Sequence, residues 1–184
     1  MDAWALQRAV RMASKIDWPK LQRLDVAQAW QWANKHIDFL DSFSGRPTGR
    51  AINAFSGLLE KNTADEPMQL VWALIGIEAL YVGGKVSIME QVREKVQSFL
   101  GKQETYKKKI VEMYNFRSRF VHGDLDFPDL HLIGDGRPAV ERFDRELLES
   151  ITMAVSILAA TLQEIIQRDW NGLSFMYQVN DSGA

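Results

Sequence analysis

Apolar residues recur along most of this chain every three or four positions, the spacing that places them on one face of an α-helix. No stretch of the sequence alternates apolar and polar residues over the length of a strand. The pattern predicts seven helices, over residues 2–15, 25–43, 48–61, 65–82, 86–100, 104–122 and 143–170. We therefore expect an all-α fold, a compact up-and-down bundle of about six or seven helices.

Helix-breaking and capping residues separate the predicted helices. Residues 123–138, for example, are rich in Asp, Gly and Pro. Thr63 and Glu66, just before a proline, fit a capping box and predict a sharp helix start. The sequence has no internal repeat, and its helical period ends near residue 170. We expect one domain over residues 1–170 and a loosely ordered tail over residues 171–184.

Composition narrows the possible classes of protein. The chain has 184 residues, of which 46% are hydrophobic, enough for one buried core. With a formal net charge of −2, the chain lacks the overall positive charge of a constitutive nucleic-acid binder. Any contact with nucleic acid must therefore be local. The absence of cysteine excludes disulfides, thiolate zinc sites, iron–sulfur clusters and cysteine nucleophiles.

Neither an export signal nor a membrane span is predicted. The start of the chain carries Asp2, Arg8 and Arg11 where a secretory signal needs a basic start and then an apolar run. Residues 70–82 and 150–163 are the most apolar stretches, and both fall short of the roughly 20 apolar residues that span a bilayer. We interpret them as buried helices and expect a cytoplasmic protein that makes no membrane contact.

Two charged residues interrupt apolar stripes. The inward-facing stripe of residues 104–122 consists of Tyr106, Ile110, Met113, Arg117 and Phe120. A buried guanidinium needs an anion, and Glu78, on the stripe of an earlier helix, offers one. The inferred Glu78–Arg117 pair has two interpretations. It either fixes helix register and does nothing else, or it aims Arg117 at a phosphate, whose oxygens match the guanidinium fork.

His122 stands at the end of the same predicted helix, five residues after Arg117, with Gly123 in the usual helix-stop position. A histidine at a helix C-terminus is suited to give or take a proton near neutral pH, although a plain capping histidine is the alternative. Five residues rotate a helix by about 140°. The two side chains therefore converge only if the last turn loosens or a second subunit contributes.

Positive charge is concentrated over residues 102–119. Six basic and two acidic residues give this segment +4, so the rest of the chain sums to −6. Such a polarised field would draw an anionic ligand, on which Tyr106 and Tyr114 could stack a base. A solvated basic face is the alternative. The basic residues are Lys102, Lys107, Lys108, Lys109, Arg117 and Arg119.

Two stretches carry a family resemblance: Trp72-Ala-Leu-Ile-Gly-Ile-Glu-Ala-Leu-Tyr81 and Met113-Tyr-Asn-Phe-Arg-Ser-Arg-Phe-Val-His-Gly-Asp124. They are similar to a HEPN domain, the higher eukaryotes and prokaryotes nucleotide-binding family, and to its Apea-like branch in particular. Arg117 and His122 meet the family signature Arg-x(4–6)-His. The match covers about residues 65–124, and the motif-bearing core would extend to residue 170.

The resemblance implies a homodimeric helical bundle. Many members of the family are metal-independent endoribonucleases that serve toxin–antitoxin, abortive-infection or antiviral systems. Arg117 would stabilise the charged phosphorane, and His122 would act as general acid or base while the ribose 2′-hydroxyl attacks the phosphodiester. The products would be a 2′,3′-cyclic phosphate and a 5′-hydroxyl. No metal or cofactor is expected, and a groove between two subunits would gather groups that one helix separates.

Further residues are assigned to the site by charge and position. Glu78 would support Arg117 and His122. Candidates for contact with the RNA substrate are Ser118, Arg119, Lys107, Lys108, Lys109, Asn115 and Tyr114. Asp124 stands where one branch of the family carries an adenylylated tyrosine, so we do not expect that mode of control. An antitoxin or other regulator would be a separate protein.

Two other functions compete with the ribonuclease. One is a metal site, suggested by His122, Asp124, Asp126, Asp129 and His131, whose spacing fits no established motif. The other is a non-catalytic HEPN module for dimerisation, partner binding or nucleotide binding, because some family members have lost catalysis. An open cleft lined by Arg117 and His122 would favour the ribonuclease, and burial of both would favour the module.

Overall fold

The described part of the chain forms seven helices and no strand. The structure is a computed structural model that describes residues 4–37, 45–59, 66–84, 87–126 and 136–176. The helices are α1 (Trp4–Ile16), α2 (Val26–His36), α3 (Pro47–Gly57), α4 (Glu66–Tyr81), α5 (Ile88–Leu100), α6 (Glu104–His122) and α7 (Pro138–Gln167). The predicted all-α bundle is confirmed. The capping residue Thr63 lies outside the described residues.

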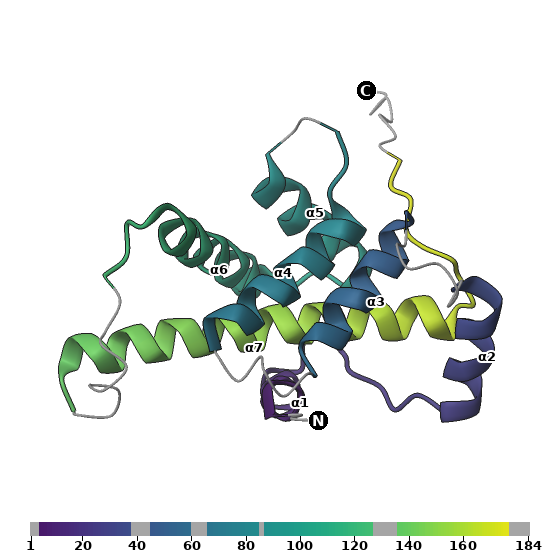
Figure 1. The fold of residues 1–184 in the computed structure, drawn as a ribbon, viewed down its shortest axis with the longest axis horizontal. Helices are drawn as coiled ribbons and strands as arrows, with labels where there is room; N and C mark the ends of the chain where they lie inside the picture. Colours follow the sequence, from purple (N-terminus) through teal and green to yellow (C-terminus); the bar gives the residue numbers. More distant parts are fainter. Residues whose placement is uncertain (1–3, 38–44, 60–65, 85–86, 127–135, 177–184) are drawn as a thin grey trace, which may run out of the picture.

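The last helix, α7, lies at the centre of the fold. Figure 1 shows it running along the length of the molecule, with α3 and α4 crossing it obliquely and α1 seen end-on. The other six helices all contact it, above all α4, α1 and α6. Every residue from 150 to 162 is buried. An isolated helix that is apolar on all sides would expose apolar surface to water, so α7 is stable because its neighbours surround it.

Polar side chains on α7 are accommodated by bonding back to the helix itself. Four hydroxyls donate to the carbonyl four residues earlier, at 2.6–2.7 Å: those of Ser150, Thr152, Ser156 and Thr161. The Thr161 hydroxyl also shares a 2.7 Å hydrogen bond with the hydroxyl of Tyr81 on α4. These bonds satisfy buried oxygens that would otherwise destabilise the core.

By length and composition alone, α7 could also cross a membrane. It has 30 residues, and its most apolar 18-residue window has a mean hydropathy of 1.3. In the folded chain, 78% of that window is buried against other helices. Because core helices of globular proteins have the same properties, this feature is weak support for a membrane protein.

A glycine allows α4 to approach α7 closely. A Cβ atom added to Gly76 would lie 2.7 Å from Cδ2 of Leu158 on α7 and 3.4 Å from Cβ of Ala54 on α3. Leu158 and Ala54 are themselves almost fully buried. The three helices therefore meet at a point where no side chain fits on α4.

A buried tryptophan joins the beginning of the chain to α5 and α6. Trp18 is 2% exposed, and its Nε1 donates to the carbonyl of Gly101 at 3.0 Å. Its ring stacks on Tyr106, with centroids 5.4 Å apart. The Tyr106 hydroxyl donates to the carbonyl of Ile16 at 3.3 Å. Tyr106 is thus held within the protein, as its place on the inward-facing stripe predicts, and Trp18 occupies a ring face that a base would need.

The segment after α7 packs against the bundle. Trp32 Nε1 donates to the carbonyl of Trp170 at 2.7 Å, and the Thr48 hydroxyl donates to that of Asn171 at 2.8 Å. Farther along, the ring of Phe175 lies 5.7 Å from that of Tyr81. Residues 171–176 therefore differ from the loosely ordered tail expected from residue 171 onward, whereas residues 177–184 lie outside the described part of the chain.

The close approach of α4 and α7 predicts coupled effects on stability. Replacing Gly76 by Ala should destabilise the protein by about 1–3 kcal/mol through overpacking against Leu158. In a Leu158→Ala background, itself destabilised by about 2–5 kcal/mol, the same change should cost less or become favourable, since alanine is the better helix former. Chemical denaturation of the four proteins measures the coupling. An equal cost in both backgrounds would contradict the predicted clash.

Gly83→Ala provides the matched control. A Cβ at Gly83 meets nothing within 4 Å, so this substitution should leave the free energy of unfolding nearly unchanged.

Candidate functional site

The C-terminal half of α6 presents Arg117 toward the protein, as its apolar stripe predicts. Ile110 and Met113 are buried on that stripe, while Arg117 and Phe120 are half-buried. A long, regular helix packed against α7 therefore sets the position of the guanidinium. No carboxylate lies within 4.0 Å of it among the residues that the structure describes.

Glu78, on α4, is an acidic residue whose charge interacts with that of Arg117. Its carboxylate is half-buried, and the Oε1 atom is buried with no hydrogen-bond partner. Burial raises the pKa of Glu78 above its ordinary value, and the positive charge of Arg117 opposes that rise. The two charges thus act on each other, although they do not form the close ion pair inferred from the sequence.

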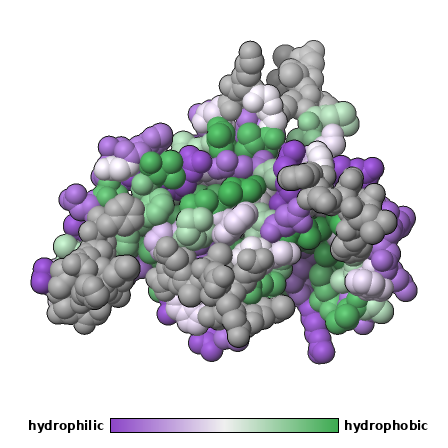
Figure 2. Space-filling view, in the orientation of Figure 1, coloured by the Kyte–Doolittle hydropathy of each residue, from purple (hydrophilic) through white to green (hydrophobic). Residues whose placement is uncertain are grey.

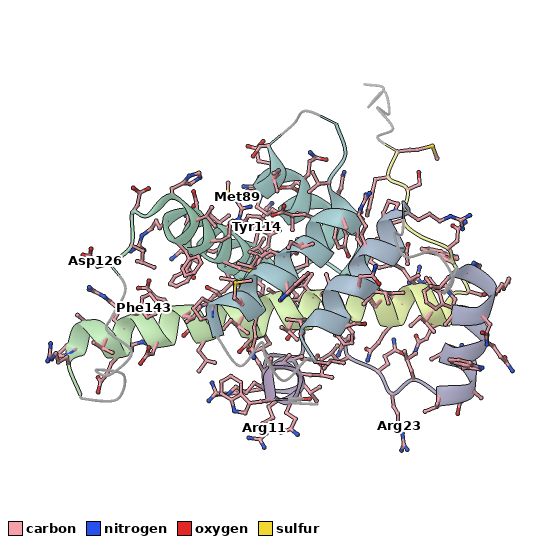
Figure 3. All side chains as sticks on the ribbon, viewed as in Figure 1. Arg11, Arg23, Met89, Tyr114, Asp126 and Phe143 are labelled. Carbon is pink, nitrogen blue, oxygen red and sulfur yellow. The ribbon has the colours of Figure 1, made fainter. Side chains whose placement is uncertain are left out.

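Tyr114 lies beside Glu78 in the interior. It is 6% exposed, and Figure 3 shows it deep among α4, α5 and α6. Burial raises the pKa of its hydroxyl, and the neighbouring Glu78 carboxylate raises it further. Among the described residues, the hydroxyl has no hydrogen-bond partner of regular geometry, and the group beside it is the Glu78 carboxylate. Because its side chain is enclosed, Tyr114 is placed to act on Glu78, which differs from its predicted contact with substrate.

His122 is exposed at the last position of α6. Gly123 follows with φ 77°, and the Asp124 amide closes the helix by donating to the Arg119 carbonyl at 2.9 Å. The predicted helix stop is confirmed. The helix stays regular through His122, so the rotation of about 140° from Arg117 is kept. Within one chain, the two side chains leave α6 on different sides.

The other cations of α6 are paired with glutamates on three helices. The Nζ–carboxylate distance is 2.7 Å for Lys109–Glu149 and 3.5 Å for both Lys107–Glu94 and Lys108–Glu112, while Arg119 Nη1 lies 3.7 Å from Glu146. These pairs compensate much of the positive charge predicted for residues 102–119. Arg117 differs from these neighbours because no carboxylate in the described part of the chain lies within 4.0 Å of it.

A groove of about 390 Å³ lies between α6 and α7. Three predicted substrate contacts line it, Lys109, Asn115 and Arg119, but so do three glutamates. Its floor is apolar, formed in part by Met113 and Phe116. Neither Arg117 nor His122 lines this groove, and neither is fully buried. A single chain therefore shows neither the open cleft that would favour the ribonuclease nor the burial that would favour the module.

The remaining candidates lie at the surface or outside the described residues. Ser118 is exposed one position after Arg117. Of the possible metal ligands, His122, Asp124 and Asp126 are exposed, while Asp129 and His131 fall in the stretch that the structure does not describe. Over the ranges that it does describe, no group of three or more histidines and carboxylates is placed to hold a metal ion.

Sequence reasoning missed the glutamates that pair with the α6 cations. Glu146 and Glu149 are three residues apart on α7 and so share a face of that helix. That spacing was a visible signal of an acidic face. Nothing in the sequence, however, indicated that this face lies opposite Lys109 and Arg119.

Comparison with known proteins adds no relative: no family model, no curated protein and no solved structure matches this chain. The resemblance to HEPN domains therefore stays a prediction from the two sequence stretches that carry it.

The raised pKa of Glu78 predicts a pH dependence of stability. The folded protein holds the Glu78 proton more tightly than the unfolded chain, so stability should fall as pH rises from 4.5 through the raised pKa. Glu78→Gln should remove this loss and so gain stability relative to wild type between pH 4 and pH 8. Denaturant unfolding at both pH values measures the difference. Glu90→Gln, at an exposed acid on α5, is the control and should show no such gain.

Proposed function

We propose that this chain is a metal-independent endoribonuclease of the HEPN type, acting on RNA in the cytoplasm as a homodimer. The observation that carries the proposal is the state of Arg117. It is half-buried and lacks a carboxylate within 4.0 Å in the described structure, whereas four neighbouring cations on the same helix are paired. A half-buried guanidinium whose donors no carboxylate engages attracts an anion strongly, and RNA supplies one at every phosphodiester.

The proposed reaction needs only groups that the chain itself carries. The ribose 2′-hydroxyl attacks the adjacent phosphorus, and the 5′ oxygen of the next nucleotide leaves. Arg117 binds the two non-bridging oxygens as negative charge builds on the phosphorane. His122 is exposed and either takes the proton of the 2′-hydroxyl as general base or gives a proton to the departing 5′ oxygen as general acid, and water carries the other proton. The products are a 2′,3′-cyclic phosphate and a 5′-hydroxyl.

Glu78 and Tyr114 act through Arg117 in this proposal. The Glu78 carboxylate opposes the guanidinium across α4 and α6 without pairing with it closely, so Arg117 keeps its donors for substrate. The buried Tyr114 side chain lies against that carboxylate. Both are therefore positioning residues and do not contact the RNA.

A homodimer resolves the separation of Arg117 from His122. Since the two side chains of one helix diverge, a second copy must bring its own groups to the same phosphate. Apolar side chains available for association are exposed beside the site: Val121 is 52% exposed on α6, and Ile75 is 44% exposed on α4. Figure 2 shows an apolar patch over α4, in the middle of the molecule.

Substrate contacts outside the two central residues divide into two groups. Ser118 and Asn115 are exposed and uncharged, so neither has to break an ion pair before it contacts RNA. Lys107, Lys108, Lys109 and Arg119 must exchange a glutamate for a phosphate, so each should contribute little to affinity.

The second candidate is a non-catalytic HEPN module for dimerisation, partner binding or nucleotide binding. The same exposed apolar residues on α4 and α6 favour it, as does the absence of a cleft shared by Arg117 and His122 within one chain. A separate antitoxin or regulatory protein would then be the partner. Absence of cleavage by the folded wild-type protein in the following experiment would favour this candidate.

Cleavage of a labelled mixed RNA by the purified protein in excess EDTA tests the ribonuclease. Wild type should cut and leave cyclic phosphate ends. His122→Ala and Arg117→Ala should each reduce the rate by about 100-fold or more, since they remove proton transfer and charge stabilisation respectively. Arg23→Ala, at an exposed cation between α1 and α2 that has no assigned role, is the control and should cut at about the wild-type rate.

Three results would contradict the assignment. Activity abolished by EDTA and restored by Mg²⁺ or Zn²⁺ would replace the mechanism with metal catalysis. Equal cleavage by wild type and His122→Ala would remove the proposed proton transfer. No cleavage by folded wild-type protein, with or without added metal, would favour the binding module.

A further inference from the structure

A second candidate binding site lies at the opposite end of α6 from His122. It is a cavity of about 320 Å³ between the C-terminal half of α5, the first turn of α6 and the segment after α7. Phe175 and Met176 cover it from the side of that segment. None of the residues assigned to phosphodiester cleavage lines this cavity except Lys107, so it can be tested independently of the proposed function.

Three lysines contribute to the wall, and two of them have no anionic partner. Lys102 has no carboxylate within 4.0 Å among the described residues. Lys95 donates to two neutral oxygens, the Tyr81 carbonyl at 2.7 Å and Gln91 Oε1 at 2.9 Å. Burial without an anion lowers the pKa of Lys95.

The third lysine shares its acidic partner. Lys107 lies 3.5 Å from Glu94, and that carboxylate also accepts a 3.0 Å hydrogen bond from Arg93. Glu104 is the other acid in the wall, and it is exposed. Positive charge therefore exceeds negative charge around this cavity, which favours an anion.

A buried amide adds a donor with no acceptor. Gln97 is 6% exposed and lines the cavity. Its Oε1 accepts from the backbone N–H of Gln103, and this bond fixes which end of the amide is nitrogen. The Nε2 atom is then left buried with no hydrogen-bond partner. Buried donors of this kind are rare in native proteins unless a ligand or water meets them.

The N-terminus of α6 also favours an anion at this cavity. Gln103, the N-cap residue, makes no side-chain cap, so the first amides of this 19-residue helix are not bonded by a capping side chain. The positive end of the helix dipole lies at this position. Helix amides, lysine ammonium groups and the Gln97 amide together form the donor set that phosphate oxygens require.

We infer that this cavity binds a small phosphorylated ligand. Lys102, Lys107 and Gln97 Nε2 would hold the phosphate, and the organic part would lie against Phe175. The centre of the Phe175 ring lies 5.2 Å from Lys95 Nζ, so the wall of the cavity holds a cation beside an aromatic face. The volume suits a ligand at the lower end of the size range of small-molecule sites.

Calorimetric titration of the full chain at constant ionic strength tests this site with three probes: inorganic phosphate, adenosine monophosphate and adenosine. A phosphate site predicts binding of the first two and none of adenosine. Tighter binding of the monophosphate would identify an organic phosphate as the ligand, and equal binding would identify inorganic phosphate.

Two variants locate the binding. Lys102→Ala removes an exposed charge, and Gln97→Glu keeps the acceptor for the Gln103 amide while replacing the free donor by a carboxylate. Each should weaken phosphate binding by about tenfold or more. Arg23→Ala, at an exposed cation outside the cavity, should bind as wild type does.

Three outcomes would overturn the inference: no binding of either phosphate up to about 10 mM, equal binding by wild type and both cavity variants, or binding of adenosine as tightly as its monophosphate. Because the probes are not cleaved and Arg117 and His122 are untouched, failure here is distinguishable from failure of the ribonuclease assay.

Discussion

The burial of α7 is the constraint on which the rest of the structure depends. Residues 150–162 are buried on every side of α7, and the other six helices all contact α7 to cover it. That requirement explains the backbone-bonded hydroxyls of α7 and the absence of a side chain at Gly76, where α4 comes within contact of Leu158. It also places α6 on α7, and α6 carries nearly all the residues with candidate chemistry.

Charge compensation distinguishes two cations, Lys102 just before α6 and Arg117 within it, from the other lysines and arginines of this segment. Lys107, Lys108, Lys109 and Arg119 each face a glutamate of α5, α6 or α7, whereas Lys102 and Arg117 face none within 4.0 Å in the described chain. Three of the buried polar side-chain atoms without a regular hydrogen bond in the described chain occur at the same two places: Gln97 Nε2 near Lys102, and Glu78 Oε1 and the Tyr114 hydroxyl near Arg117. Unpaired charge and unsatisfied donors or acceptors together indicate where a ligand would be stabilised.

The candidate site was predictable in part. Stripes spaced at three and four residues indicated that Arg117 and Glu78 each lie on the inward face of its own helix, because helical periodicity is local. Gly123 indicated the end of α6 for the same reason, since a left-handed residue closes a helix wherever it occurs. The roles of Tyr106 and Tyr114 were not predictable. Trp18 is 88 residues from Tyr106 along the chain, and no local pattern indicates that their rings stack.

The sequence by itself determined the helices, their approximate ends, the all-α class and the register of Arg117 on its helix. Each depends on interactions between residues at most a few positions apart. Only the tertiary structure decided which cations are compensated, which tyrosines are enclosed, and that residues 171–176 pack on the bundle. These outcomes depend on contacts between distant segments, such as Lys109 with Glu149 and Phe175 with Tyr81, which form only once α7 has been covered.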